Sequence, residues 1–260
     1  MITSTQNPKV KYIRALQSHG RFRRQENAFI AEGIRLVEEA LKADWDARMI
    51  LYSEGLNERG QALVSAYSDR GAQVLQGSDQ VMRAASDTQT PQGLIAVLPI
   101  RELQVSATMD FVFVPDGVHD PGNMGTMLRT ALAAGVEATF IPPDTVDVYA
   151  PKVMRAGMGA HFHLPIRNLT WQEISDRLRM SQLKIYLADA SAGRRYTQAE
   201  FQQPCAIIIG GEAEGAGELA RNLADEYLHV PMLGDAESLN AGVAAGVVLF
   251  EVVRQRSIDR

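Results

Sequence analysis

Cysteine, clustered metal-ligating side chains and long apolar runs are all scarce in this chain of 260 residues. The single cysteine, Cys205, excludes an internal disulfide, and its place at the start of the apolar run 205–209 favours a buried thiol over a nucleophile. The histidines are scattered, no acidic or cysteine cluster completes a ligand set, and the pair His161 and His163 is expected to alternate across a strand-like segment. The sequence therefore predicts no metal site.

Membrane and secretory signals are also lacking. The longest uncharged apolar stretch, residues 238–250, is too short to cross a bilayer, and the chain begins with a polar stretch rather than a signal pattern. A single cysteine fits a reducing compartment. We therefore expect a soluble, cytoplasmic protein with no membrane partner.

Positive charge is in the minority, because the formal net charge is −5, and this argues against indiscriminate coating of nucleic acid. The first 24 residues are an exception, since they contain no acidic residue. Their basic residues are Lys9, Lys11, Arg14, Arg21, Arg23 and Arg24. This asymmetry predicts a local phosphate-binding surface for RNA. The alternative is a charged, solvated helix face.

What is present is a two-part pattern. Residues 1 to about 100 alternate helical and extended signals, with a helix from Ile34 and a strand over 49–52, and a turn at 90–93 precedes a strand over 93–98. A polar stretch over 101–108 then reads as a linker. We expect two domains, residues 1–103 and 109–260.

The second part repeats a strand–loop–helix pattern. Five short apolar runs predict central strands: 111–115, 139–142, 184–188, 206–209 and 227–230. Near-continuous hydrophobicity within such runs is expected when helices cover both faces of a parallel sheet, so the fold class is α/β. Helices are expected over 126–134 and over 239–256, and the second is apolar on nearly every face.

Polar, glycine-bearing loops follow three of these runs. Asn123, Gly125 and Arg129 lie in or just after the first loop, the second reads Gly210-Gly211-Glu212-Ala213, and the third contains Ser238-Leu239-Asn240. Together, in order and spacing, they resemble the signature motifs of the SpoU/TrmH branch of the SPOUT RNA methyltransferases. Residues 230–232 complete the third motif.

The resemblance implies a fold that periodicity cannot propose. In this family the catalytic parallel sheet is tied in a deep trefoil knot, which is very rare among folds. Residues 1–103 resemble the family's smaller α/β substrate-binding domain, which is like a ribosomal RNA-binding protein. The cues lie in residues 7–11, 29–33 and 90–93. The family also implies a homodimer, for which the final helix and residues 146–158 are the predicted contact surface, with Met154 and Met158 expected on one helical face.

The resemblance assigns catalytic roles to Asn123, Arg129, Glu212, Ser238 and Asn240. An arginine keeps its proton at ordinary pH, so we expect Arg129 to stabilise the charge that grows on a ribose hydroxyl rather than to act as a base. The alternatives are structural. Asn123 alone would suit an Asx-turn, Glu212 a solvated surface charge, Arg129 a loop contact and Ser238 the cap of the last helix.

The donor implied by the family is S-adenosylmethionine, with no metal. Family members hold it through backbone groups at positions that match Gly210, Val230, Met232 and Leu239, and the missing Cβ of Gly210 and Gly211 would let the backbone approach a ligand. Two stretches depart from the family pattern. Gly211 and Ala213 replace Asn and Gly of the second motif, and Gly242 replaces Ser in the third.

We therefore predict an S-adenosylmethionine-dependent 2′-O-ribose methyltransferase acting on RNA, and 23S rRNA is the expected substrate. A tRNA substrate is the alternative within the same class. A non-catalytic RNA-binding or ribosome-assembly factor of the same fold is the rival from another class. Nicotinamide-binding and nucleotide-hydrolysing sites are disfavoured, because the glycine loops lack both characteristic patterns.

Overall fold

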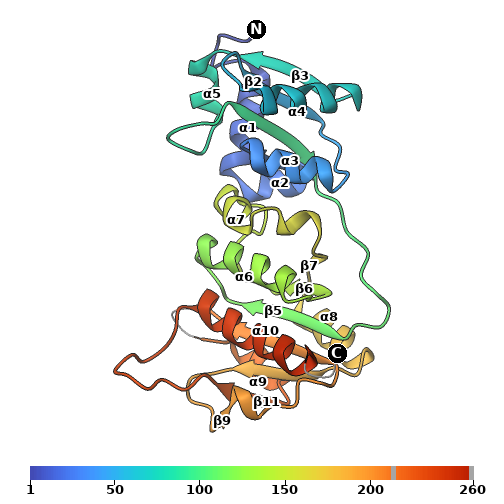
Figure 1. Ribbon diagram of the computed structural model, residues 1–260, viewed down its shortest axis with the longest axis vertical. Coiled ribbons are helices and arrows are strands. Elements are labelled where there is room, and N and C mark those ends of the chain that lie inside the picture. The colour runs from blue at the N-terminus through green and yellow to red at the C-terminus, as the bar shows by residue number, and fades with distance from the viewer. Residues whose placement is uncertain (212–214, 258–260) are drawn as a thin grey trace. The chain divides into compact units, whose positions relative to one another are not determined.

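The computed structural model describes residues 1–211 and 215–257 and consists of two compact units (Figure 1). Unit one contains Met1–Arg101 together with Asp147–Phe162, and unit two contains Glu102–Val146 together with His163–Arg260. The segment Asp147–Phe162 comes from the part of the sequence that we assigned to the second domain. The bounds 1–103 and 109–260 remain a prediction.

Unit one is built on a four-stranded sheet in the order β1-β4-β2-β3, in which only β2 and β3 run parallel. Its strands are β1 (Ala28–Glu32), β2 (Met49–Ser53), β3 (Gln73–Gly77) and β4 (Leu94–Pro99). Its first five helices are α1 (Pro8–Ser18), α2 (Gly20–Glu26), α3 (Ile34–Lys42), α4 (Glu58–Asp69) and α5 (Asp79–Ala85). The helix expected from Ile34 and the strand expected over 49–52 are confirmed.

Local chemistry sets where α1 begins and which face it buries. Asn7 caps the helix, because its side chain accepts a hydrogen bond from Lys9 N, and Pro8 occupies the first position, where a backbone N–H has no partner. Val10, Ile13 and Leu16 follow at helical spacing and are fully buried in the core of this unit. The exposed side of α1 is thereby fixed as the side that carries its basic residues.

The segment Asp147–Phe162 completes the core of unit one with α7 (Pro151–Gly157) and the short 3-10 helix η1 (Ala160–Phe162). Phe162 packs edge-on against Trp45, with ring centroids 5.3 Å apart, and the ring of Tyr149 lies 4.9 Å from that of Phe29. Buried aromatic pairs of this kind stabilise a core beyond their area alone. Unit one therefore depends on residues from the second half of the chain.

Two expectations for this segment are wrong. His161 lies in a 3-10 helix rather than in a strand-like segment, because the chain turns tightly after the left-handed residue Met158. Met154 and Met158 were expected on one helical face as dimer contacts. Met154 is instead buried, and Met158 lies beyond the last helical residue, so the two do not form one exposed face.

Unit two contains a seven-stranded sheet in the order β7-β6-β5-β10-β8-β11-β9, and every strand pair in it is parallel. Its strands are β5 (Phe111–Asp116), β6 (Ala138–Ile141), β7 (Ile166–Asn168), β8 (Lys184–Ala188), β9 (Arg194–Arg195), β10 (Cys205–Gly210) and β11 (Glu226–His229). Its helices are α6 (Pro121–Ala133), α8 (Trp171–Met180), η2 (Tyr196–Gln198), α9 (Glu218–Leu223) and α10 (Ala241–Ser257).

All five predicted strands of this unit are present, and the predicted α/β class is confirmed. The strands β7 and β9 escaped prediction because they are short and carry polar residues. Helix α6 begins five positions before the predicted start at 126. Asp120 explains the difference, since its Oδ1 accepts a hydrogen bond from Asn123 N at 2.8 Å and Pro121 occupies the first helical position.

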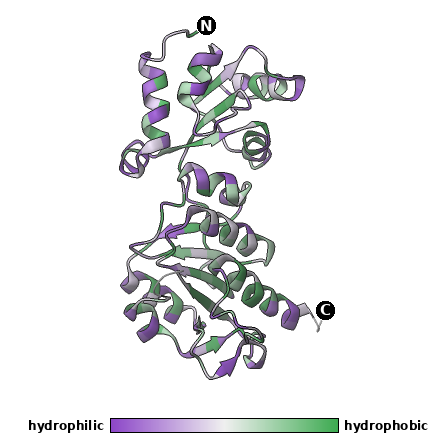
Figure 2. Cartoon of the chain, turned by 90° about the vertical axis from the view of Figure 1, so that its left-hand side faces the viewer, coloured by the Kyte–Doolittle hydropathy of each residue, from purple (hydrophilic) through white to green (hydrophobic). Residues whose placement is uncertain are grey.

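The core of unit two lies on its central strands. Strands β5 and β10 are buried almost throughout, and Figure 2 shows their hydrophobic colouring continuing into α10. Helix α10 packs on α6 and β10. Cys205 opens β10 as a buried free thiol, and burial raises its pKa to about 12. Among the described residues, no helix is long and apolar enough to span a bilayer.

Candidate active site

A cavity of about 770 Å³ opens in unit two where β8, β10 and β11 reach their carboxyl ends. Its walls come from the residues that follow these strands, from the segment 230–239 and from the first turns of α10. Such a crevice beyond the carboxyl ends of parallel strands is the usual ligand site of an open α/β sheet. The location therefore follows from the topology.

The cavity brings together every residue predicted to hold the donor. These are Gly210, Gly211, Val230, Met232 and Leu239. The backbone N–H groups of Val230, Met232 and Leu239 have no acceptor among the described residues, so they are available to a ligand. A mixed lining of apolar side chains and free backbone groups suits a purine nucleoside. The residues present thus fit S-adenosylmethionine.

The two glycines of the second motif are required by the protein's own backbone. A Cβ on Gly210 would lie 2.2 Å from Ala216 N, and one on Gly211 would lie 2.0 Å from the carbonyl oxygen of Gly117. We expected these glycines to admit a ligand. Their Cβ directions point at neighbouring loops, so the missing side chains allow close passage of the chain.

The first and third motifs meet through a pair of asparagines. Asn240 Nδ2 donates to Asn123 Oδ1 at 3.0 Å, while Asn240 Oδ1 accepts from Gly242 N at 3.0 Å and Val243 N at 3.3 Å. Asn240 thus caps α10 and links it to the start of α6. The cap that we considered for Ser238 belongs to Asn240, and Ser238 instead lines the cavity.

The departure at Gly242 has a packing consequence. A Cβ at this position would lie 3.2 Å from Asn240 Oδ1 and 3.5 Å from Thr126 Cγ2. The first distance is tight and the second is ordinary van der Waals contact. Glycine therefore leaves room for the Asn240 side chain, whose Oδ1 accepts from Gly242 N and caps α10.

Arg129 lies on the exposed side of α6 and does not line the cavity. No described residue forms an ion pair or a hydrogen bond with it, so the structural alternative of a paired or loop-capping arginine has no support in the described part of the chain. A guanidinium without a protein partner is available to an anionic or polarised substrate group. Glu212 and Ala213 lie outside the described residues.

Several polar residues of the cavity escaped prediction. They are Asp189, Ser191, Arg195, Arg221 and His229. Asp189 Oδ1 accepts hydrogen bonds from Ser191 N at 2.8 Å and Ser191 Oγ at 2.6 Å, and Arg221 pairs with the other oxygen. Burial opposes ionisation, but the bonds from Ser191 and Arg221 lower the pKa of Asp189. The polar residues directly after the strand 184–188 were the signal that could have identified this wall.

Asp116 holds the backbone near the start of α9. It is buried at the end of β5, opposite Gly210 in the ladder, and its Oδ2 accepts from Gly217 N at 2.7 Å. Burial raises the pKa of Asp116, with a smaller contribution from Asp144. This side chain thereby holds the backbone at Gly217, next to the start of α9.

The predicted RNA-binding residues lie on two helices of unit one. Lys9, Lys11 and Arg14 are exposed on α1, and Arg21 and Arg24 are exposed on α2. The prediction is wrong for Arg23. It is buried, donates from Nε and Nη2 to Asp147 at 3.0 and 2.7 Å, and donates from Nη1 to two carbonyls of α1. Its role is to bind the segment 147–162 to unit one, not to contact phosphate.

Metal ligation has no candidate in the described ranges, which contain no group of three His, Cys, Asp or Glu placed to hold an ion. His161 illustrates why isolated histidines do not suffice. It is buried, its Nε2 bonds the carbonyl of Val148 at 2.7 Å, and burial lowers its pKa to about 4. It is a structural residue of unit one.

Comparisons with known proteins agree with this geometry. Residues 110–250 match the model of the SpoU rRNA methylase family, and residues 7–96 match an MRM3-like substrate-binding domain. A 23S rRNA (guanosine(2553)-2'-O)-methyltransferase of Bacillus subtilis (strain 168) is 34% identical over 251 residues, which cover 96% of this chain and 98% of that protein. A 23S rRNA (uridine(2479)-2'-O)-methyltransferase of Streptomyces viridochromogenes is 29% identical, covering 99% and 93%.

A solved structure supports S-adenosylmethionine as the cofactor. The AdoMet-bound rRNA methyltransferase from Sinorhizobium meliloti superposes with a TM-score of 0.87 at 29% identity, covering 97% of each chain. The similarity therefore spans both units. The two sequence relatives act on different nucleotides, so similarity to either does not identify the nucleotide that this chain would modify.

Proposed function

We propose that this chain, which belongs to the SpoU rRNA methylase family, transfers a methyl group from S-adenosylmethionine to a ribose 2′-hydroxyl of 23S rRNA. One observation carries the proposal. The cavity at the carboxyl ends of the strands contains every predicted donor contact, and it lies beside the bond between Asn123 and Asn240. A cytoplasmic location is part of this proposal and is supported by the bacterial relatives named for 23S rRNA modification.

S-Adenosylmethionine supplies an electrophilic methyl group on a sulfonium. The free backbone groups of Val230, Met232 and Leu239 would hold it, and Ser238 lies at the same wall. As its oxygen takes the methyl group, the ribose hydroxyl gives its proton to water. The role of this chain is then to orient that hydroxyl and to stabilise the negative charge that develops on its oxygen. Asn240 positions the start of α10, and with it the two residues of the third motif that precede the helix.

Arg129 is the residue that we assign to the hydroxyl. Its guanidinium is exposed, unpaired among the described residues and permanently protonated, so it suits charge stabilisation and not proton abstraction. Ser238 lines the donor cavity, and Asn123 and Asn240 hold the starts of α6 and α10 together. The only ground for proposing a catalytic role for Glu212 is its position in the second motif.

Ribosomal RNA is favoured over tRNA because both curated relatives named above act on 23S rRNA and because residues 7–96 match a substrate-binding domain of a ribosomal RNA methyltransferase type. A non-catalytic assembly factor would need neither an unpaired Arg129 nor the Asn123–Asn240 pair. The exposed residues Lys9, Lys11, Arg14, Arg21 and Arg24 are the proposed phosphate-binding surface.

The test is transfer of labelled methyl groups from S-adenosylmethionine to 23S rRNA and to bulk tRNA. We expect transfer to 23S rRNA, loss of at least about 100-fold in Arg129→Ala, the scale of one lost oxyanion donor, and donor affinity within a few-fold of wild type. Arg177→Ala on α8 is the matched control, because Arg177 is also exposed. Transfer to tRNA alone would overturn the ribosomal assignment, and normal transfer by Arg129→Ala would overturn its role.

The proposal also includes the assembly and the chain topology that the family implies. We propose a homodimer formed through α10 and a trefoil knot in the catalytic sheet. The dimer is supported by the exposed apolar residues Val243 and Phe250 on α10. The knot is supported by the strand order, in which β10 lies between β5 and β8, and by the close passage of Gly211 past Gly117.

A further inference from the structure

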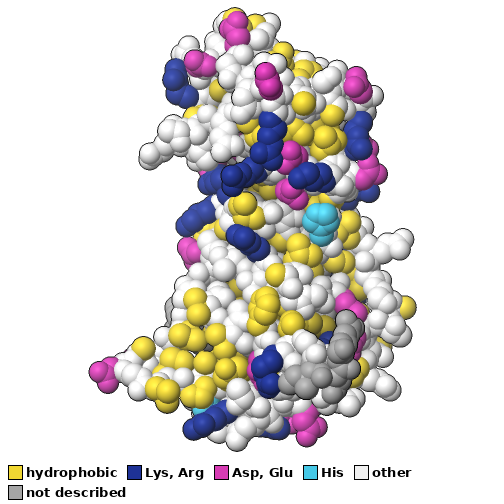
Figure 3. Space-filling view, viewed as in Figure 1, with side chains coloured by type: hydrophobic (Ala, Val, Ile, Leu, Met, Phe, Trp, Pro, Cys, Tyr) yellow, Lys and Arg dark blue, Asp and Glu magenta, His cyan; other side chains and the backbone are white. Residues whose placement is uncertain are grey.

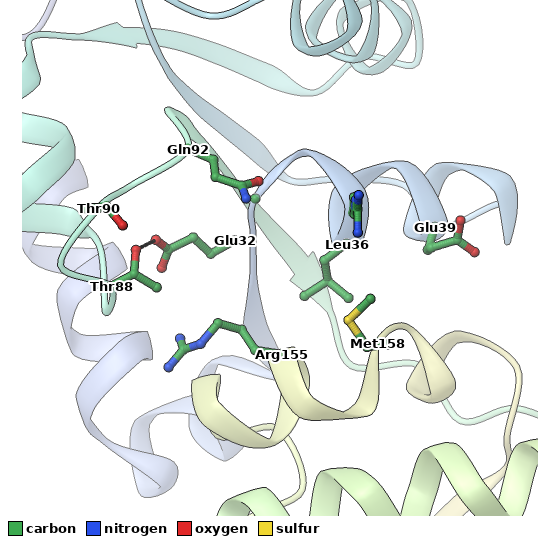
Figure 4. Close-up of a pocket in the computed structure, with 10 residues that line it drawn as sticks. Glu32, Leu36, Glu39, Thr88, Thr90, Gln92, Arg155 and Met158 are labelled. Carbon is green, nitrogen blue, oxygen red and sulfur yellow. Dashed lines mark hydrogen bonds between the residues drawn. The ribbon is translucent and has the colours of Figure 1, made fainter.

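Unit one contains a cavity of its own, of about 410 Å³, that none of the functions above uses. Its walls come from three separate parts of the chain: the end of β1 with the first turns of α3, the loop between α5 and β4, and α7 with Met158. Figure 4 shows Leu36 and Met158 pointing toward one another on one side, with Thr88, Thr90 and Gln92 on the loop opposite. One wall is apolar and the other carries hydrogen-bonding groups.

The loop that forms the polar wall is tied to the end of β1 by the carboxylate of Glu32. Glu32 accepts hydrogen bonds from Thr88 Oγ1 at 2.8 Å and from Asp87 N at 3.1 Å, and it also bonds the hydroxyl of Ser86. Gln92 Oε1 accepts from Ile34 N at 3.1 Å, which fastens the far end of the loop to α3. The cavity is therefore a preformed site, and preformed sites lose less entropy on binding.

The charged residues that line this cavity indicate which class of ligand it would bind. Arg35 and Arg155 line the cavity, but Glu32 and Glu39 line it too, and Arg155 Nη2 already pairs with Asp87 at 2.8 Å. Figure 3 likewise shows basic and acidic side chains side by side over the part of unit one that holds α3 and α7. A lining with balanced charge does not suit a free anion. It suits a neutral, flat group with polar edges, together with one flanking anion at Arg35, which is exposed and unpaired among the described residues.

We propose that this cavity takes one unpaired nucleobase of the RNA substrate, an inference that rests on the proposed function. The base would lie against Leu36 and Met158, its edge would bond Thr88, Thr90 or the free amide nitrogen of Gln92, and its phosphate would face Arg35. Proteins that read single-stranded RNA splay out a base, most often onto an aromatic ring or an arginine plane, and bond its edge; here the apolar side chains of Leu36 and Met158 would supply the packing surface. The volume is that of a small-ligand site.

The site would also choose where the catalytic unit acts. Arg155 and Met158 belong to Asp147–Phe162, which continues directly into residues 146 and 163 of unit two. A base held in the cavity therefore contacts a segment that is covalently joined at both ends to the catalytic unit. Specificity for one nucleotide sequence around the target would come from this contact, whereas the basic residues of α1 and α2 would bind any phosphate backbone.

The test uses the full chain and a 23S rRNA transcript, with binding measured at several salt concentrations. Thr90→Trp fills the cavity mouth, and we expect it to weaken binding about tenfold or more, the scale of one lost stacked base, with the salt slope unchanged. Arg35→Ala should reduce the slope by about 0.7, the value for one single-strand phosphate contact. The controls are Gln89→Trp, an exposed neighbour outside the lining, and Arg83→Ala on α5.

The outcomes separate the alternatives. Wild-type affinity in Thr90→Trp, with donor binding and thermal unfolding unchanged, would overturn the inference even if the wild-type chain methylates the transcript. No methylation by the wild-type chain would instead overturn the proposed function. Millimolar AMP, GMP, CMP, UMP and inorganic phosphate serve as competitors. Micromolar binding of any of them would identify a free-nucleotide or phosphate site and contradict the RNA assignment. If Thr90→Trp does not fold, Arg35→Ala carries the test.

Discussion

At the scale of single residues, the structure brings several of the predicted positions together and shows contacts within the chain that the sequence did not indicate. Gly210, Gly211 and Asn240 were expected to serve the ligand directly. The glycines are needed because loops of the protein pass within 2.0 to 2.2 Å of where a Cβ would lie, and Asn240 is needed because it caps α10 and bonds Asn123. A motif records which residue is required, but it does not distinguish a ligand contact from a contact within the chain.

Substitution of Gly211 tests this interpretation. In Gly211→Ala the new methyl group would overlap the carbonyl of Gly117, so we expect a loss of unfolding free energy of about 1–3 kcal/mol, as for other overpacked sites, and weaker donor binding. Gly193→Ala is the matched control, because nothing lies within 4 Å of its Cβ position. Urea unfolding and calorimetry with the donor measure both effects. Equal stability of the two variants would contradict the close passage.

The lowered pKa of His161 predicts how the free energy of unfolding depends on pH. Burial lowers its pKa to about 4, so the unfolded chain takes up a proton near pH 6.5 while the folded chain does not. The contribution of neutral His161 to the free energy of unfolding is fully present above about pH 6.5. It decreases as the pH falls toward about 4, by at most about 1.4 kcal/mol per pH unit. In His161→Gln this component should disappear. Urea unfolding across that pH range checks it, and parallel pH profiles for the two proteins would refute it.

At the scale of helices and strands, strong caps and apolar runs were sufficient to predict the element from its own sequence. The strands of unit two and the helix from Ile34 follow from their own sequences. The exceptions are informative. The strand β9 is two arginines whose strand geometry comes only from pairing with β11, and α7 packs on unit one although its sequence neighbours belong to unit two. Neither fact is encoded locally, because both depend on partners distant in the sequence.

The position of α7 predicts how fragments behave. A fragment of residues 1–103 lacks Asp147 and Phe162, so the buried Arg23 loses its carboxylate partner and Trp45 loses one ring contact. Leaving a buried charge unpaired is strongly destabilising, on the order of 3–5 kcal/mol. We expect red-shifted emission from Trp45, the only tryptophan of that fragment, and a blue shift when a peptide of residues 147–162 is added. Scrambled peptide is the control. Native emission from the fragment alone would contradict the contact.

At the scale of the whole molecule, composition and periodicity established an α/β class and a parallel sheet but not the order of its strands. The placement of β10 between β5 and β8 determines which loops meet, and pairing order is not readable from any one strand. The resemblance to a known family supplied what periodicity could not, because three separated motifs imply one shared site. The cavity in unit one had no such motif, and only the structure reveals it.

The last prediction concerns assembly. Val243, Val247 and Phe250 recur at helical spacing on α10, and Val243 and Phe250 are 52% and 48% exposed, which is unusual for apolar residues on a helix that otherwise packs on α6 and β10. Figure 3 shows hydrophobic side chains gathered in this part of unit two. Apolar surface left in water favours association, and a symmetric pair would bury one copy of the face against another.

We therefore expect light scattering at micromolar concentration to give twice the 28.5 kDa mass of one chain. The double variant Val243→Glu and Phe250→Glu should give the mass of a single chain, because two carboxylates on each face would have to be buried without partners. Leu219→Glu on α9 is the matched control, since Leu219 is 59% exposed but lies apart from this face. If the wild-type chain has the mass of a monomer, or if the double variant remains a dimer, α10 is not the contact and its apolar face must have another role.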